Sequence, residues 1–227
     1  CTRIEWSRPA AVWAMDPGQL GPRHWNLVGD LASRFRFELF VATELPARTI
    51  AGQLETLFAR HGAPLVLKRD NGSNLAGGEV DELLDAYGVI ALNSPPHYPA
   101  YNGAIEYAQR ELKARIERLT AQGLALDEAL VQAPVLLNAT PRPCLNDQTA
   151  AEVFYPARDD FQRQFTLTRR KEIHDLIQDE ASCIRVRMER CGHPAQGAAW
   201  RRAIEQWLEE NGLMTVRQPQ IVLPHYP

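Results

Sequence analysis

Short apolar runs separated by turn-forming residues occupy the first part of the chain. Residues 10–15 form an apolar run that stops at Asp16 and is followed by Pro17 and Gly18, which is typical of a buried strand ending in a turn. Further short apolar runs predict four more strands, at 26–30, 36–42, 64–68 and 89–92. The pattern therefore predicts a sheet, with Asp16 at the end of its first strand.

Apolar residues at helical spacing lie between and after these runs. Ile50, Leu54 and Leu57 recur with this spacing and predict an amphipathic helix, which ends before Gly62, a residue favoured just after a helix C-terminus. Helices are predicted over 49–61, 79–87, 103–119, 126–137 and 200–211. The order of strands and helices predicts an α/β fold, in which helices pack on the faces of a mixed sheet.

A change of composition near Tyr155-Pro156 predicts a division of the chain. Its 227 residues suggest one domain plus an appendage, at roughly 150 residues per domain. We expect a linker remnant over 1–9, a core over 10–156 and a mostly helical extension over 157–227, with a short strand at 214–223. The residues of the extension do not indicate its function.

The overall composition excludes several classes of protein. With 45% hydrophobic and 23% charged residues, the chain resembles an ordinary globular protein rather than a disordered or fibrous one. A net charge of -3 argues against nonspecific coating of nucleic acid. No apolar run reaches the roughly 18 residues of a membrane span, and no secretory signal pattern opens the chain, so we expect a cytoplasmic protein.

Cysteine and histidine residues near the C-terminal end allow a zinc site as an alternative. His174, Cys183, Cys191 and His193 could gather one ion, but they lack the paired C-x-x-C or H-x-x-x-H spacing that prepares such sites. We therefore expect reduced thiols and ordinary helical or loop residues.

Three carboxylates from separate segments carry the candidate chemistry. Asp16 and Asp70 follow predicted strands, and Glu106 lies in the first turn of a helix that follows a proline-rich loop. Like charges gather unfavourably unless hard divalent cations bind them, and Mg²⁺ prefers oxygen ligands. Taken singly, each aspartate is an ordinary turn former and Glu106 could complement the helix dipole. Together they predict two-metal phosphoryl transfer.

The text around these carboxylates resembles the D,D-35-E signature of retroviral integrases and bacterial insertion-sequence transposases. Asp70 and Glu106 are separated by 35 residues. The similar segments are WAMD at 13–16, DLASR at 30–34, KRDNGS at 68–73, NGAIE at 102–106 and TAAEVF at 149–154. The resemblance covers residues 10–156 and implies a ribonuclease H-like fold with a mixed five-stranded sheet. Asp30 corresponds to a residue outside the catalytic three, so we interpret it as structural.

The resemblance also implies roles for individual residues. Asp16 would bridge two Mg²⁺ or Mn²⁺ ions, with Asp70 and Glu106 each completing one coordination sphere. Arg110 and Lys113 share a helix face with Glu106 and stand where the family has DNA-contacting residues. The alternatives are an ion pair between Arg110 and Glu106 and a solvated Lys113.

The proline-rich segment 94–102 matches the loop that the family places beside the scissile phosphate. Tyr98 or Tyr101 could stack on a base. Asn102 is both a plausible N-cap for the following helix and a candidate DNA contact. A rigid connector is the alternative for the whole segment.

Together these features predict a DNA transposase or integrase that cleaves and joins strands in DNA recombination. Its expected partners are double-stranded DNA and further copies of the chain assembled on it. A nuclease of the same fold and a domesticated, inactive DNA-binding subunit are the alternatives. The sequence departs from the family at Pro17-Gly18, at Asp147 and at Ala150, none of which removes a predicted metal ligand.

Overall fold

The computed structural model describes residues 3–95, 99–188 and 192–217. Its strands are β1 (Arg3–Trp6), β2 (Val12–Leu20), β3 (Arg23–Asp30), β4 (Val41–Ala42), β5 (Val66–Arg69), β6 (Ile90–Asn93) and β7 (Met214–Arg217). Its α-helices are α1 (Ala47–His61), α2 (Gly78–Tyr87), α3 (Gly103–Ala121), α4 (Leu126–Asn138), α5 (Ala150–Gln164), α6 (Leu167–Arg187) and α7 (His193–Glu210). Two short 3₁₀ helices, η1 (Pro99–Asn102) and η2 (Pro143–Leu145), precede α3 and α5.

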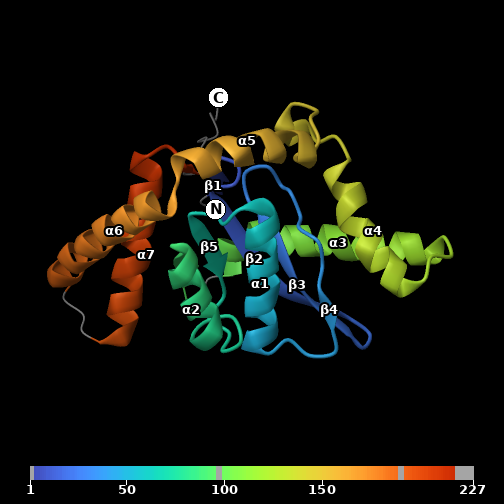
Figure 1. The fold of residues 1–227 in the computed structure, drawn as a ribbon, viewed down its shortest axis with the longest axis horizontal. Coiled ribbons are helices and arrows are strands. Elements are labelled where there is room, and N and C mark those ends of the chain that lie inside the picture. The colour runs from blue at the N-terminus through green and yellow to red at the C-terminus, as the bar shows by residue number, and fades with distance from the viewer. Residues whose placement is uncertain (1–2, 96–98, 189–191, 218–227) are drawn as a thin grey trace, which may run out of the picture.

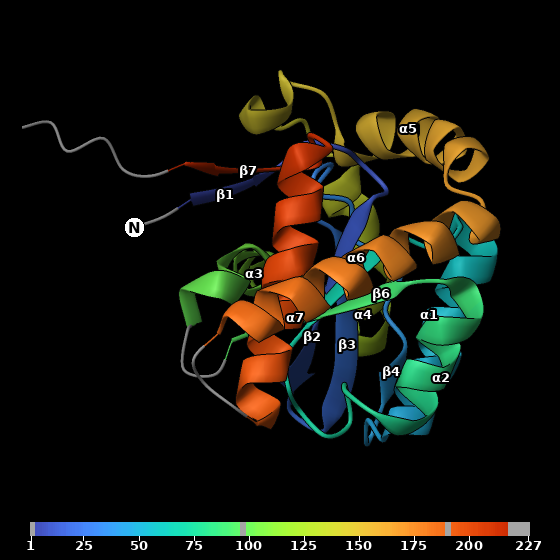
Figure 2. The same ribbon diagram turned by 90° about the vertical axis from the view of Figure 1, so that its left-hand side faces the viewer.

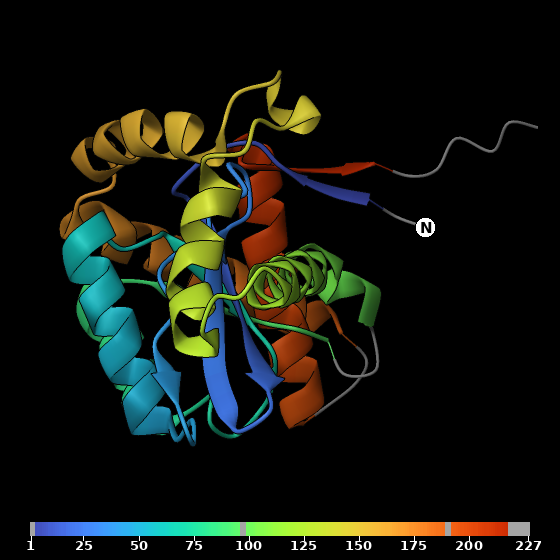
Figure 3. The same cartoon turned by 90° about the vertical axis from the view of Figure 1, so that its right-hand side faces the viewer.

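The central sheet has five strands in the order β4-β3-β2-β5-β6. The strands β2, β3 and β4 pair antiparallel, whereas β5 and β6 run parallel to β2. The views from the two sides show α1 and α2 on one face and α3 on the other (Figures 2 and 3). The predicted α/β architecture, a mixed five-stranded sheet flanked by helices, is confirmed (Figure 1).

The strand β2 is longer than the sequence predicts. Asp16 pairs with Leu27 in the middle of β2, so the prediction that this strand ends at Asp16 is wrong. The reason is that β5 pairs with β2 only from Val12 to Ala14, while β3 continues to pair with it as far as Leu20. Asp16 therefore lies just beyond the parallel part of the sheet, where β2 no longer pairs with β5 but still pairs with β3.

The predicted strand at 36–42 is also reduced. Only Val41–Ala42 forms β4, and Arg36 makes an isolated bridge with Gly29. The backbone of Arg36 is bound instead by the side chain of Asn138, which accepts from its N–H at 2.9 Å and donates to its carbonyl at 2.7 Å. A helix side chain thus replaces part of the strand pairing.

An aromatic cluster fills the core beneath α5. The rings of Trp13 and Phe37 lie 4.0 Å apart, and Phe35 stacks on Phe154 at 4.5 Å. Trp13, Phe37 and Phe154 are fully buried. Burial of such rings stabilises a fold by about 2–3 kcal/mol each, so the cluster ties the sheet to α5.

The C-terminal extension is helical, as predicted, and it packs against the core. The helix α5 continues through residue 157, so the predicted boundary lies within a helix, and the division of the chain stays a prediction. On α6 the buried Arg170 donates to the carbonyls of Ala63 and Pro64 at 2.6 and 2.8 Å. The segment predicted as a linker remnant contributes β1, which pairs with β7 (Figure 2).

Candidate active site

The three predicted carboxylates come from neighbouring elements. Asp16 lies on β2 and is partly exposed, Asp70 directly follows β5 and is exposed, and Glu106 is exposed in the first turn of α3. Burial raises the pKa of Asp16, and the charges of Glu106 and Asp70 raise it further. A hydrogen bond from Gln109 and the charge of Lys113 act in the opposite direction. The carboxylates are therefore close enough to act on one another electrostatically.

The side chain of Gln109 fixes α3 to the strand that carries Asp16. Its amide donates to the backbone carbonyl of Asp16 at 2.7 Å and accepts from the indole N–H of Trp25 at 3.1 Å. Gly18 makes this contact possible, because a Cβ there would lie 2.3 Å from Nε1 of Trp25 and 2.8 Å from Nε2 of Gln109. The sequence pattern of β2 therefore leaves space for a polar clamp between the strand and the helix.

The end of β5 holds Asp70 through its neighbours. The carboxylate of Asp70 accepts from the N–H of Asn71 at 2.8 Å, and the amide of Asn71 donates to the carbonyl of Ser94 at 2.7 Å. This bond links the turn after β5 to the residue after β6. The predicted position of Asp70 at a strand end is confirmed.

Asn102 occupies the N-cap position of α3, but its side chain does not cap the helix. Its carbonyl oxygen accepts instead from the ammonium of Lys68 and from the hydroxyl of Ser94, the latter at 2.7 Å. Lys68 is buried, and burial lowers its pKa to about 7, against the charges of Glu205, Glu106 and Asp70. The start of the helix that carries Glu106 is thus tied to β5.

The residues predicted to contact DNA differ in accessibility. Arg110 is exposed and lies 5.7 Å from the ring of Tyr107, and within the described part of the chain it forms no ion pair with Glu106. Lys113 is partly exposed, with Nζ 6.0 Å from the ring of Trp25. Tyr101, predicted to stack on a base, is buried instead.

Two other predicted residues give no direct geometry for DNA contact. Tyr98 lies outside the described residues, and Asn102 is partly buried in its bonds to Lys68 and Ser94. Their roles toward DNA stay predictions.

The donor set of the site suits hard divalent cations, since carboxylate oxygens are the ligands that Mg²⁺ and Mn²⁺ prefer. Among the described residues, however, no three His, Cys, Asp or Glu side chains stand close enough together to hold an ion as they are placed. The alternative zinc site is likewise not assembled there: His174 packs on Trp200 with ring centroids 5.3 Å apart, Cys183 is exposed, and Cys191 lies outside the described residues.

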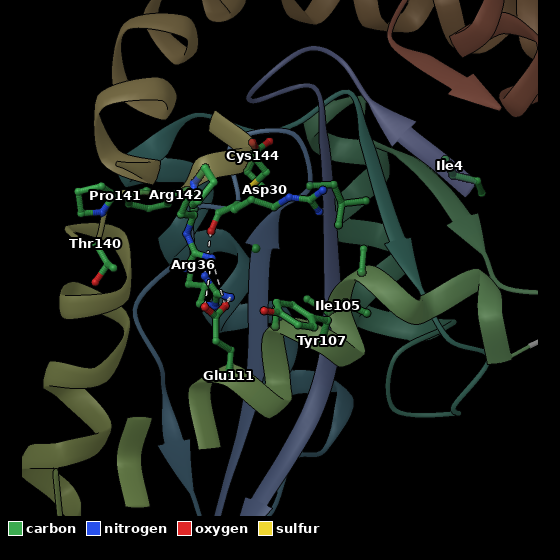
Figure 4. A pocket seen from close by; sticks show the side chains of 17 residues that line it. Ile4, Asp30, Arg36, Ile105, Tyr107, Glu111, Thr140, Pro141, Arg142 and Cys144 are labelled. Carbon is green, nitrogen blue, oxygen red and sulfur yellow. Dashed lines mark hydrogen bonds and ion pairs between the residues drawn. The ribbon is translucent and has the colours of Figure 1, made fainter. Parts of the chain in front are cut away.

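The opposite face of α3 borders a cavity of about 640 Å³ (Figure 4). Glu111 reaches from α3 to two arginines there, pairing with Arg36 and, at 3.1 Å, with Arg142. Asp30 also lines this cavity and is fully buried: it accepts from the N–H of Ala10 at 2.8 Å and from the N–H and hydroxyl of Ser33 at 2.8 and 2.5 Å. These contacts give Asp30 the structural environment expected from the sequence.

Sequence reasoning missed three residues of the site: Gln109, Lys68 and Glu205. Gln109 lies three residues after Glu106, so helical spacing could have placed both on one face. Lys68 precedes Asp70 by two residues, which places both on the same side of an extended chain. No local signal connects Glu205, 99 residues after Glu106, with the site.

Comparisons with known proteins show which folds the chain resembles. No family model matches the chain. Over 154 residues it is 27% identical to an uncharacterized protein of Caenorhabditis elegans, and over 161 residues 26% identical to the Gag-Pol polyprotein of feline leukemia virus. These matches cover 66% and 68% of the chain, but the chain spans only 12% and 9% of those two proteins.

The solved structures that resemble the chain include the following two. The catalytic core domain of BIV integrase has a TM-score of 0.58 at 24% identity, covering 68% of this chain and 99% of that one. A simian T-cell lymphotropic virus intasome in complex with PP2A regulatory subunit B56 gamma gives 0.60 at 18% identity, covering 66% and 55%. The predicted resemblance to integrase catalytic cores and the ribonuclease H-like fold are thereby confirmed. Within the described residues, no helix is both long and apolar enough to span a membrane.

Proposed function

We propose that this chain is the catalytic core of a metal-dependent DNA transposase or integrase. The observation that supports the proposal is the placement of Asp16, Asp70 and Glu106 on elements of an integrase-like fold that contact one another, where the charges of Glu106 and Asp70 raise the pKa of Asp16. Such an arrangement of like charges is unfavourable by itself and is typical of sites that bind cations.

Asp16, Asp70 and Glu106 would hold two Mg²⁺ or Mn²⁺ ions. Two such ions, when bound, activate an attacking oxygen and stabilise a leaving oxygen in phosphoryl transfer. The carboxylates fit this role because all three supply hard oxygen donors and two of them are exposed.

The proposed reaction has two steps, and each is a displacement at phosphorus. Water attacks a donor phosphorus and the P–O3′ bond breaks, which leaves a free 3′-hydroxyl. That hydroxyl then attacks a target phosphorus, and a target P–O3′ bond breaks as the new one forms. The chain provides position and charge rather than a nucleophile of its own.

Basic side chains on the face of α3 beside Glu106 would orient the DNA. Arg110 is exposed, and the positive charge of Lys113 lowers the pKa of Asp16, which is consistent with a position of Lys113 near that carboxylate. Phosphate oxygens bound by these two residues would lie next to the site. The partner is double-stranded DNA, and the similarity to an intasome supports an assembly of several copies on it.

Substitution of Asp70 tests the proposal. Asp70→Asn keeps the shape of the side chain but removes the charge that attracts a divalent cation. We expect strand cleavage and the joining of pre-cut ends to fall below detection in Mg²⁺ and in Mn²⁺, with DNA affinity largely kept. The control is Asp85→Asn, which removes an exposed carboxylate from α2 and should leave both reactions unchanged.

Other outcomes distinguish the remaining functions. Near-normal joining by Asp70→Asn would overturn the metal assignment and the proposal together. Metal-dependent cleavage without joining would identify a nuclease of the same fold. DNA binding by the parent protein without either reaction would identify an inactive DNA-binding subunit.

A further inference from the structure

A partly buried hydrogen bond connects the C-terminal extension to the start of the helix that carries Glu106. The hydroxyl of Tyr101 in η1 donates to Oε1 of Glu205 on α7 at 2.6 Å. Tyr101 is only 8% exposed, and burial raises its pKa well above the usual range, so its hydroxyl keeps the proton that it donates. Because η1 runs directly into α3, this bond lies five residues before Glu106.

Lys68 connects the same turn to the strand that carries Asp70. Its ammonium donates to the carbonyl of Tyr101 at 2.7 Å and to the side chain of Asn102, and it lies 4.1 Å from the centre of the Tyr101 ring. Lys68 is 3% exposed, and the charge of Glu205 favours its protonated form. Glu205 therefore holds the turn directly, through Tyr101, and indirectly, through the charge of Lys68.

The helix α7 is itself fixed to the edge of the sheet. The indole of Trp200 donates to the carbonyl of Ala91 at 3.1 Å, and Arg201 donates to the carbonyl of Asn93 at 3.3 Å. Both carbonyls belong to β6, beside which α7 lies (Figure 2). The helix that carries Glu205 is thus fixed to the sheet, and so is the residue that binds Tyr101.

We infer that Glu205 and Tyr101 are positioning residues for Glu106, so that the C-terminal extension is part of the catalytic unit rather than an appendage. The inference rests on the proposed function. Asp16, Asp70 and Glu106 repel one another, and a helix start that is free to shift would let Glu106 move away. The bond from α7 opposes that movement, in the way that outer contacts orient the ligands of metal sites.

Three variants test the inference. Glu205→Gln replaces the charged acceptor of the hydrogen bond by a neutral one, and Tyr101→Phe removes the hydroxyl that donates it. Glu210→Gln is the control, because it makes the same charge change at an exposed position of α7. Divalent-metal affinity is measured by calorimetry with Mn²⁺ alone, and the Mg²⁺ concentration for half-maximal joining of pre-cut DNA is measured separately. We expect both to weaken by about 10-fold or more in the first two variants, with DNA affinity unchanged and activity restored by excess Mg²⁺.

Hydrogen exchange provides a readout that does not depend on activity. The amides of residues 101–106 should exchange faster in Glu205→Gln and Tyr101→Phe than in Glu210→Gln. If Glu205→Gln does not fold, Tyr101→Phe still decides the question, because it removes a single oxygen atom.

The outcomes separate this inference from the proposed function. A parent protein that neither binds Mn²⁺ nor joins DNA overturns the proposed function. A parent that does both, with the two positioning variants indistinguishable from Glu210→Gln in metal affinity and exchange, overturns only this inference. A loss of thermal stability with unchanged metal affinity would show that the contact supports the fold alone, which also overturns it.

Discussion

The two faces of α3 differ in how their negative charges are compensated. On one face Glu106 joins Asp16 and Asp70, and their mutual repulsion is only partly offset by Lys113. On the other face Glu111 is bound by two arginines beside a cavity. One helix therefore carries a face on which carboxylates raise the pKa of a neighbouring carboxylate, and a face on which the carboxylate is paired with two arginines. The difference predicts that substitutions on the first face lower catalytic activity, whereas substitutions on the second face lower the free energy of unfolding.

The largest expected effect is on the first face. Glu106→Gln removes a metal-binding charge and should reduce cleavage and joining below detection, while the melting temperature stays the same or rises because repulsion with Asp16 is relieved. Activity assays and thermal unfolding of the same preparation check this. A variant that unfolds at a much lower temperature would show that Glu106 supports the fold.

The matched change on the second face is Glu111→Gln, five residues along the same helix. Arg36 is 3% exposed, and leaving it without a carboxylate should cost about 3–5 kcal/mol of unfolding free energy. Denaturant unfolding measures this loss, and metal affinity should remain near that of the parent. Equal losses of metal affinity in Glu106→Gln and Glu111→Gln would remove the distinction between the faces.

A smaller effect is expected from Asp30, which lines the same cavity. Burial raises its pKa from 3.8 to about 6, so the native state binds its proton more tightly than the unfolded state. The stability that Asp30 contributes is therefore complete below pH 3.8 and is lost as the pH rises through 6, by up to about 3 kcal/mol.

The test compares the parent with Asp30→Asn at pH 5 and pH 8. Asn cannot reproduce both accepting oxygens, so the variant should be less stable at either pH, but its disadvantage should narrow at pH 8. A constant difference would mean that Asp30 does not titrate in this range.

The smallest effect is expected from Lys113 on the first face. Lys113→Ala should weaken DNA affinity and reduce the slope of log affinity against log salt concentration by about one unit, if the lysine contacts one phosphate. Binding measured over a series of salt concentrations checks this. An unchanged slope would show that Lys113 is a solvated residue that acts only on Asp16.

Much of the fold could be predicted from the sequence because local patterns set it. Ile50, Leu54 and Leu57 gave the period of α1, and Gly88, which follows α2, takes the left-handed conformation expected at a helix end. The pairing of β1 with β7 could not be predicted, since these two short strands lie more than 200 residues apart in the chain. Local patterns do not state which distant strand is the partner.

The candidate site, like the fold, could be predicted only in part. The text around the three carboxylates was sufficient to predict that they lie on neighbouring elements, while their assembly into a metal site stays a prediction. The extent of β2 beyond Asp16 could not be predicted, because Pro17 and Gly18 normally end a strand, while here β3 continues to pair with them. Glu205 could not be predicted either, because its contact with Tyr101 exists only after the extension has packed on β6.

The pairing of β1 with β7 also has a mechanical consequence. Arg3 stands directly opposite Arg217, and the antiparallel ladder continues to Trp6 and Met214. A force applied between these two ends loads one residue pair at a time, as in opening a zipper, instead of shearing the whole ladder at once. Stretching of single molecules from residues 3 and 217 should therefore detach β7 at low force, before the five-stranded sheet bears any tension.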